Sequence, residues 1–158
     1  MKDGCAKCEH CAKGDFFYCE VAPRNYSLTD RDQGSFSTYA VWPDTNLHKI
    51  PDNISSAQAA PFLCAGLTVF TPMVRYGIQP GHRVGVIGIG GLGHLAIQFA
   101  AKLGANVTVF SSSENKRQEA LSLGASDFKI SKELKTKKLD HKLDYLIITA
   151  TGHPDWEM

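Results

Sequence analysis

Four of the five cysteines lie close together near the start of the sequence. They are Cys5, Cys8, Cys11 and Cys19, separated by two, two and seven residues. Four thiolates at such short intervals can surround one tetrahedral zinc ion, and because no ligand position is then left for water, such a site is structural. His10 lies between two of these cysteines and is expected to be a solvated neighbour, since four thiolates already satisfy the metal.

Other chemistry is open to the same cysteines. In a secreted chain they could form two disulfides, but the N-terminus shows no apolar signal segment, which favours a metal. Free thiols are the simplest alternative. An iron–sulfur cluster is another, because ferredoxins also use two-residue gaps. The Cys-x3-Cys-Pro segment that usually follows is absent, which favours zinc over the cluster.

A glycine-rich turn predicts a dinucleotide site in the second half of the chain. The turn has the pattern G-x-G-x-x-G and consists of Gly88, Ile89, Gly90, Gly91, Leu92 and Gly93. An apolar strand precedes it and an apolar helix follows, which is the context that the motif requires. Gly88 would make the tight turn, Gly90 would let the backbone approach a pyrophosphate, and Gly93 would let helix and strand pack closely. The alternative is a glycine turn without a ligand.

The residues after the second strand of this region bear on which dinucleotide binds. An NAD enzyme usually places Asp or Glu there, about 20 residues past the glycines, to bind the ribose 2′-hydroxyl. Here the chain has Ser111, Ser112 and Ser113, followed by Lys116 and Arg117. Hydroxyls and positive charge suit a 2′-phosphate, so NADP is favoured over NAD. Glu114 is discordant unless it points to solvent, and the serines could instead cap the next helix.

Strands and helices alternate from residue 83 onward. We expect strands at 83–87, 106–110, 127–130 and 143–149, and helices at 92–103 and 115–123. Residues 131–142 are polar and lysine-rich, typical of a solvated helix or loop. This alternation predicts a parallel α/β sheet with right-handed crossovers, a doubly wound arrangement.

The first half of the chain is less regular. Its aromatic, β-prone segment 36–42 predicts a strand, and 47–50 a second short extended piece. Ser55 or Ser56 can cap a short helix that runs to about residue 61. An apolar helical segment, 65–76, follows, and Pro72 within it should cause a kink or a turn.

Composition excludes several classes of protein. The 158 residues include 17 Lys and Arg and 16 Asp and Glu, a net charge of +1, which lacks the basic excess of a nonspecific nucleic-acid binder. Apolar stretches fall short of a membrane span, and no secretory h-region is present. We therefore expect a cytoplasmic chain without nucleic-acid or membrane partners. Length alone predicts about one domain.

Taken together, the cysteine group, the segment Ala-Pro-Phe-Leu-Cys64-Ala-Gly-Leu-Thr68-Val-Phe, the glycine turn and the three serines resemble one family. They are similar to the zinc-dependent medium-chain alcohol dehydrogenases, in particular the cinnamyl alcohol dehydrogenase branch. The resemblance implies a partial Rossmann domain over 66–158. It also implies that 1–65 is the C-terminal part of a GroES-like β domain carrying a structural zinc lobe.

The resemblance also assigns roles to matching positions. The four clustered cysteines would bind a structural zinc, and Cys64 would be one ligand of a catalytic zinc; without the resemblance, Cys64 would be interpreted as a small buried hydrophobic residue. Thr68 would lie against the nicotinamide. The three serines and Lys116 would bind the 2′-phosphate of NADP(H). The implied reaction is hydride transfer between NADPH and a small aldehyde or primary alcohol, in proteins that are often homodimers.

The sequence departs from the family at both ends. The other catalytic-zinc ligands, a Gly-His-Glu motif and the proton-relay hydroxyl lie upstream of the zinc lobe in the family, and this sequence starts at the lobe. It stops just after the fourth expected strand, where the family continues. We therefore expect negligible turnover by the isolated chain. The alternatives are a non-catalytic fragment that binds structural zinc and NADP, and a zinc-binding interaction module without redox chemistry.

Overall fold

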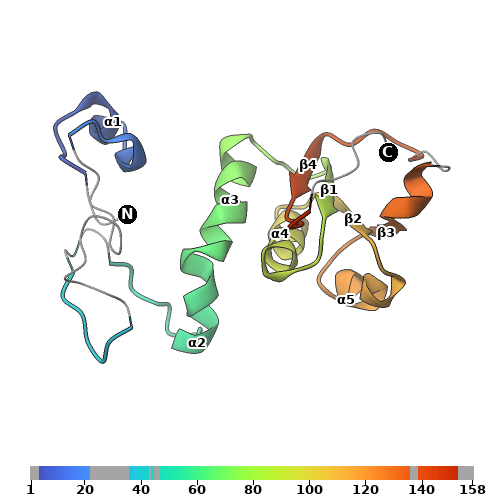
Figure 1. The fold of residues 1–158 in the computed structure, drawn as a ribbon, viewed down its shortest axis with the longest axis horizontal. Helices are drawn as coiled ribbons and strands as arrows, with labels where there is room; N and C mark the ends of the chain where they lie inside the picture. Colours follow the sequence, from blue (N-terminus) through green and yellow to red (C-terminus); the bar gives the residue numbers. More distant parts are fainter. Residues whose placement is uncertain (1–3, 22–35, 43, 45–46, 136–138, 153–158) are drawn as a thin grey trace. The chain divides into compact units, whose positions relative to one another are not determined.

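The computed structural model describes residues 4–21, 36–42, 44, 47–135 and 139–152 (Figure 1). The chain divides into two compact units, residues 1–51 and 52–158. The segment that links the cysteine region to the first long helix thus belongs with the second unit, where the ring of Phe62 lies 6.1 Å from that of Phe99. The expected division at residues 65 and 66 concerns homologous domains and stays a prediction.

In the first unit, a short helix and a 3-10 turn surround the cysteines. Helix α1 spans Glu9–Ala12, and the 3-10 helix η1 spans Phe16–Tyr18. The strand predicted over 36–42 is not formed, and residues 47–50, expected to be a short extended piece, belong to no strand. A strand is stabilised by a neighbouring strand, and the described residues of this unit provide none. The prediction rested on residue type alone.

The second unit begins with a well-capped helix. Helix α2 spans Ser56–Ala59 and continues as the 3-10 helix η3, Ala60–Leu63. Ser55 is its N-cap: the Ser55 hydroxyl accepts from the Gln58 backbone N–H at 3.3 Å, and the Gln58 side chain accepts from the Ser55 N–H at 3.1 Å. This reciprocal pair satisfies two amide groups that the helix start would otherwise leave unpaired. Helix α3, Ala65–Arg75, follows and continues for three residues past Pro72.

The predicted parallel sheet is confirmed. Its strands are β1 (Arg83–Ile87), β2 (Asn106–Ser111), β3 (Asp127–Ile130) and β4 (Tyr145–Ile148), and the helices between them are α4 (Gly91–Lys102), η4 (Glu114–Lys116), α5 (Arg117–Ser122) and η5 (Ser131–Lys135). The strand order is β3-β2-β1-β4, with parallel neighbours throughout. Such an order is typical of a partial Rossmann fold.

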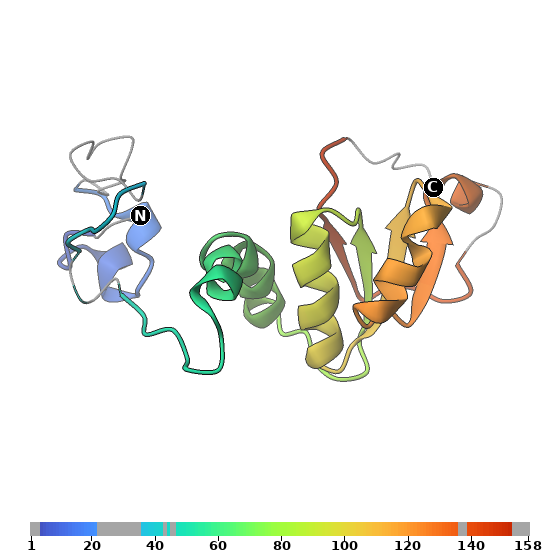
Figure 2. The ribbon, with the colours of Figure 1, turned by 90° about the horizontal axis from the view of Figure 1, so that it is seen from below.

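The core lies between the sheet and the helix that follows the glycine turn. Helix α4 packs against β1 and β2, while α5 packs against β3 (Figure 2). The fully buried side chains of this core include Val84, Val86, Ala96, Ile97, Val107, Val109 and Phe128. Because β1 and β2 are buried almost throughout, the loops at their carboxyl ends are held by a rigid support. Those loops carry the predicted cofactor residues.

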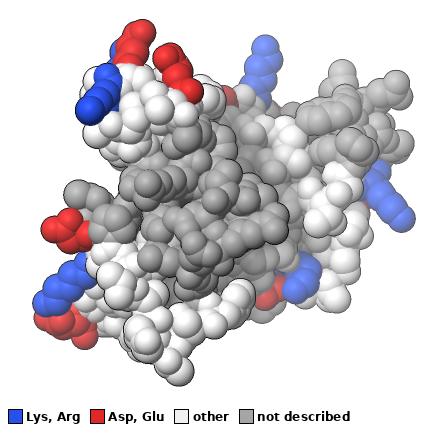
Figure 3. Space-filling model, turned by 60° about the vertical axis from the view of Figure 1, so that its left-hand side comes forward, with Lys and Arg blue, Asp and Glu red and all other residues white. Residues whose placement is uncertain are grey.

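The surface is mixed in charge. On the face drawn in Figure 3, clusters of charged side chains contain both signs, in keeping with the net charge of +1. Among the described residues, no one helix has the length and apolar composition needed to cross a membrane. One bent pair, Ser56–Leu63 with Ala65–Arg75, meets those two conditions jointly, with a bend of 54° between its halves.

Candidate metal and cofactor sites

The four clustered cysteines come together in the structure. The sulfur atoms of Cys5, Cys8, Cys11 and Cys19 all lie within 4.8 Å of one another. The Sγ atoms of Cys5 and Cys11 are 3.9 Å apart. A tetrahedral zinc with Zn–S bonds of about 2.3 Å places its sulfurs about 3.8 Å apart. The sulfur arrangement therefore fits one zinc ion with four thiolate ligands.

The local backbone conformation directs the four thiols toward one another. Ala6 adopts a left-handed conformation with a φ of 57°, which turns the chain sharply between Cys5 and Cys8. Backbone N–H groups point at sulfur: that of Cys8 donates to Cys5 Sγ, and that of Cys5 donates to Cys19 Sγ, both at 3.3 Å. A Cβ on Gly4 would lie 2.5 Å from Cys11 Sγ, so this position has no room for a side chain. Amide donors of this kind stabilise thiolate charge.

Two of the thiols differ in acidity. The backbone N–H of Cys11 lowers the pKa of Cys8 below its ordinary value. Burial raises the pKa of Cys11 to about 12, and a hydrogen bond with Cys8 adds to the effect. Because zinc binds thiolates, the ion must displace the Cys11 proton, and its affinity for the site falls as the pH falls. His10 is outside the cysteine group; its ring lies 3.8 Å from Glu20 and is partly exposed.

The glycine turn connects β1 to α4, and the space next to its two central glycines contains no other protein atoms. Gly88 has a φ of 94°, a conformation that L side chains rarely adopt. A Cβ on Gly93 would lie 2.1 Å from the Gly88 carbonyl oxygen, so α4 can approach the turn only without a side chain there. By contrast, a Cβ on Gly90 or Gly91 would meet no protein atom within 4 Å. The open space at those two glycines is where a ligand's phosphates can approach the N-terminal amides of α4.

A cavity of about 830 Å³ lies beside this turn and contains the other predicted cofactor residues. Among its lining residues are Gly88, Gly90, Ser111, Ser112, Ser113 and Lys116. Sequence reasoning did not identify Asn115, Lys132 or the segment 149–152, which also line it. The segment 149–152 follows β4 directly, and ligands of open parallel sheets bind at the carboxyl ends of strands. That rule could have found these residues.

The chain is similar to known proteins in both sequence and fold. Residues 91–156 match the zinc-binding dehydrogenase family. Cinnamyl alcohol dehydrogenase 5 of Arabidopsis thaliana is 41% identical over 158 residues, which is 95% of this chain and 43% of that protein. A cinnamyl alcohol dehydrogenase from Helicobacter pylori, solved in complex with NADP(H), superimposes with a TM-score of 0.83 at 31% identity, over 97% of this chain and 45% of that one.

Over residues 91–156 the chain is similar to the zinc-binding dehydrogenases. Its relatives include cinnamyl alcohol dehydrogenases, as the sequence resemblance indicated, and the chain spans less than half the length of those relatives. An acetophenone reductase from Geotrichum candidum, solved in complex with NAD, is also similar, with a TM-score of 0.78 at 28% identity over 97% of this chain and 44% of that one. Structural likeness thus extends to complexes with either dinucleotide.

Three serine hydroxyls lie at the carboxyl end of β2, at positions 111, 112 and 113. Ser111 is buried and accepts from the Ser113 N–H at 3.3 Å. The Ser113 hydroxyl donates to the Asn115 side chain at 2.7 Å. Ser113 precedes η4 but makes no side-chain hydrogen bond to the backbone of that helix. The capping alternative for the serines is therefore not seen at Ser113.

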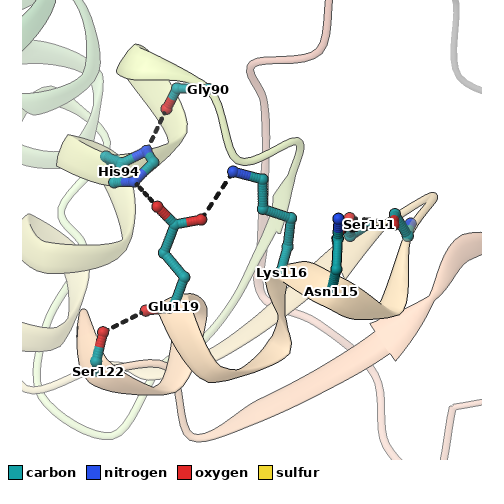
Figure 4. A network of polar contacts seen from close by, with 8 residues as sticks. Gly90, His94, Ser111, Asn115, Lys116, Glu119 and Ser122 are labelled. Carbon is teal, nitrogen blue, oxygen red and sulfur yellow. Dashed lines mark hydrogen bonds and ion pairs between the residues drawn. The ribbon is translucent and has the colours of Figure 1, made fainter.

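The two basic residues after the serines differ in what they contact. Lys116 lines the cavity and donates to Glu119 at 2.9 Å (Figure 4). Arg117 pairs instead with Glu114, lies 4.7 Å from the centre of the Phe128 ring and donates to the Phe128 carbonyl at 3.2 Å. These contacts hold the Arg117 guanidinium against β3, and of the two basic residues only Lys116 lines the cofactor cavity. Glu114 is exposed but paired with Arg117, which lowers the pKa of its carboxyl.

The two residues assigned to catalysis lie at the start of α3. Cys64 is exposed and forms the N-cap of the helix, so it is not the small buried residue that spacing alone suggested. Among the described residues it joins no second group of metal-ligating side chains. The Thr68 hydroxyl donates to the Cys64 carbonyl at 2.9 Å. Thr68 lines a separate cavity of about 340 Å³, which shares Thr149 with the larger one.

Proposed function

We propose that this chain is part of an NADP(H)-linked alcohol dehydrogenase, which transfers hydride between NADPH and a small aldehyde or primary alcohol. The observation that carries the proposal is the end of β2, where three hydroxyls and Lys116 line the cofactor cavity at the position where an NAD enzyme has an acid. The ammonium and hydroxyl groups are donors that suit a 2′-phosphate, whereas a carboxylate would repel it. The Helicobacter pylori relative bound to NADP(H) supports the same cofactor.

Each group of residues has its own task in this proposal. Gly90 and Gly91 leave room for the pyrophosphate at the start of α4, and the helix dipole favours the negative charge. The serines and Lys116 bind the 2′-phosphate, which fixes the adenosine end of the cofactor. NADPH supplies the hydride, and the protein supplies its orientation. The four-cysteine zinc has a structural task, because its ligand shell is closed.

A catalytic zinc does not fit the described residues by themselves. Such a site needs three protein ligands, and Cys64 is the only side chain of the described ranges that the family resemblance assigns to it. The second candidate function is a non-catalytic chain that binds structural zinc and NADP.

We expect the 158-residue chain to show negligible zinc-dependent NADPH oxidation with an aldehyde. The reason is that one thiolate cannot hold a Lewis-acid zinc in place. The measurement is the decay of NADPH absorbance with purified chain and excess zinc, and a full-length cinnamyl alcohol dehydrogenase under the same conditions is the positive control. Turnover within tenfold of that control contradicts the expectation.

We expect the chain to bind NADPH more tightly than NADH, and Lys116→Ala to remove most of the difference. A hydrogen bond from an ammonium to a phosphate contributes about 1.5–3 kcal/mol, so the dissociation constant of NADPH should rise about 10- to 100-fold while that of NADH changes less than about twofold. Binding is followed by cofactor fluorescence. Lys102→Ala, which removes the same charge from the last turn of α4, serves as the control.

The outcome that contradicts the proposal concerns the unaltered chain. Equal affinity for NADPH and NADH would mean that the hydroxyls and Lys116 do not contact a 2′-phosphate. A Lys102→Ala chain that loses as much NADPH affinity as Lys116→Ala would show that only net charge matters.

A further inference from the structure

One carboxylate beside the cofactor cavity contacts both a lysine and a histidine side chain. Glu119, on α5, accepts from the Lys116 ammonium at 2.9 Å through Oε2, while its Oε1 lies 2.7 Å from Nε2 of His94 (Figure 4). His94 is on α4, 25 residues earlier in the sequence. The carboxylate therefore bridges the two helices that follow β1 and β2.

His94 is itself anchored on the glycine turn. Its Nδ1 lies 2.8 Å from the Gly90 carbonyl oxygen (Figure 4). A carbonyl can only accept, so Nδ1 carries a hydrogen atom and donates it. The other ring nitrogen, Nε2, faces the carboxylate of Glu119. Contacts with Lys116 and then His94 lower the pKa of Glu119, so Glu119 is ionised at neutral pH.

We propose that Glu119, buttressed by His94, is the positioning residue that holds the Lys116 ammonium at the 2′-phosphate end of the cofactor cavity. The contacts run from the Gly90 carbonyl through His94 and Glu119 to Lys116. The glycine turn, where the pyrophosphate would bind, therefore also anchors the ammonium that would bind the 2′-phosphate. The inference rests on the proposed binding of NADP(H) and adds to it two residues that do not touch the cofactor.

The need for such a residue follows from the nature of lysine. A free lysine side chain carries about 2 kcal/mol of rotamer entropy, which is lost when its ammonium is fixed on a ligand. The Lys116 side chain is 42% exposed, so packing does little to fix it. The contact with Glu119 restricts it before the cofactor arrives, and preorganisation of this kind raises affinity.

The contact with Glu119 leaves most of the N–H donors of the Lys116 ammonium available to a ligand. An ammonium has three N–H donors, and the contact with Glu119 uses one, leaving two for phosphate oxygens. The other carboxylate oxygen of Glu119 contacts the His94 ring. Arg117 cannot take over the task of Lys116, since it is held by Glu114 and Phe128.

The test compares two probes that differ in one phosphate, adenosine 2′,5′-bisphosphate and 5′-AMP, by titration calorimetry on the zinc-loaded chain. For Glu119→Gln we expect affinity for the bisphosphate to fall about five- to tenfold, a typical coupling within one polar network. Affinity for 5′-AMP should change less than about twofold. For His94→Ala we expect a smaller loss, about two- to threefold, again confined to the bisphosphate.

A double variant shows whether Glu119 acts through the lysine. When Lys116→Ala is already present, adding Glu119→Gln should leave affinity for the bisphosphate unchanged within about twofold. Glu114→Gln is the matched control: it neutralises a carboxylate five residues away that pairs with Arg117, and it should leave both affinities unchanged. Circular dichroism confirms that each variant is folded before titration.

Several results overturn the inference. Tighter binding of the bisphosphate to Glu119→Gln would mean that Glu119 competes with the ligand for Lys116. Equal loss for both probes would indicate a structural role only, and no loss would mean that the contact is incidental. Failure of the proposed function is recognised separately, because it appears in the unaltered chain as equal affinity for the two probes, and it overturns this inference as well.

Discussion

The 158-residue chain is expected to bind one zinc ion, and the Cys8→Ser variant none. The four sulfurs lie within 4.8 Å of one another, a spacing that fits a single tetrahedral ion. Serine is a poor zinc ligand at neutral pH because its hydroxyl stays protonated. Structural zinc contributes about 10–16 kcal/mol of apparent binding free energy, so the effect of removing a ligand is large. Metal content is measured by elemental analysis after dialysis.

Zinc removal should also disorder the cysteine region. Among the described residues of the first unit, only Cys11 and Cys19 are buried, so these residues form no apolar core that could hold them in place without metal. We expect a chelator to increase proteolysis within residues 4–21 and to leave the sheet of the second unit intact. Limited proteolysis with mass spectrometry reads both regions in one experiment.

The matched control for the zinc prediction is Cys64→Ser. Cys64 is exposed and lies outside the cysteine group, so this variant should retain one zinc per chain. Cobalt substitution identifies the ligands, because four thiolates give a tetrahedral cobalt spectrum with intense sulfur charge-transfer bands. Two zinc ions per unaltered chain, or a chain isolated with iron and sulfide, would contradict the prediction. The second result would restore the iron–sulfur alternative.

The sheet was predictable because its signals are local. Each buried strand is a short apolar run, and Gly104 and Gly124 follow the last turns of α4 and α5. Alternation of strand and helix then leaves a parallel order as the favoured arrangement. The cysteine site was predictable for the same reason, since its ligands all lie within 15 residues of one another.

Contacts between distant residues were not predictable in this way. The strand expected over 36–42 needed a partner that its own residue types could not specify. Arg117 and Lys116 look equivalent in sequence, yet they face different neighbours because one lies against Phe128 and the other at the cavity. His94 and Glu119 carry no motif; they meet only because α4 and α5 are adjacent.

The glycine turn gives the other large prediction, in which two alanine substitutions separate binding from folding. For Gly93→Ala we expect destabilisation of about 3 kcal/mol, the cost of overpacking a site that cannot relax. The added Cβ would lie 2.1 Å from the Gly88 carbonyl oxygen, and a backbone atom cannot move aside as a flexible side chain can. The higher helix propensity of alanine offsets only about 1 kcal/mol of this cost. Urea unfolding followed by circular dichroism measures the net change.

For Gly90→Ala we expect the added methyl group to weaken ligand binding and to leave the stability of the fold nearly unchanged. A Cβ at this position meets no protein atom within 4 Å, so stability should change by less than about 1 kcal/mol. The methyl group projects into the space that a pyrophosphate would use, and affinity for NADPH should fall at least about tenfold. Full affinity in a folded Gly90→Ala chain would show that the phosphates do not approach this turn. Equal stability of the two variants would show that α4 can withdraw from Gly88 without cost.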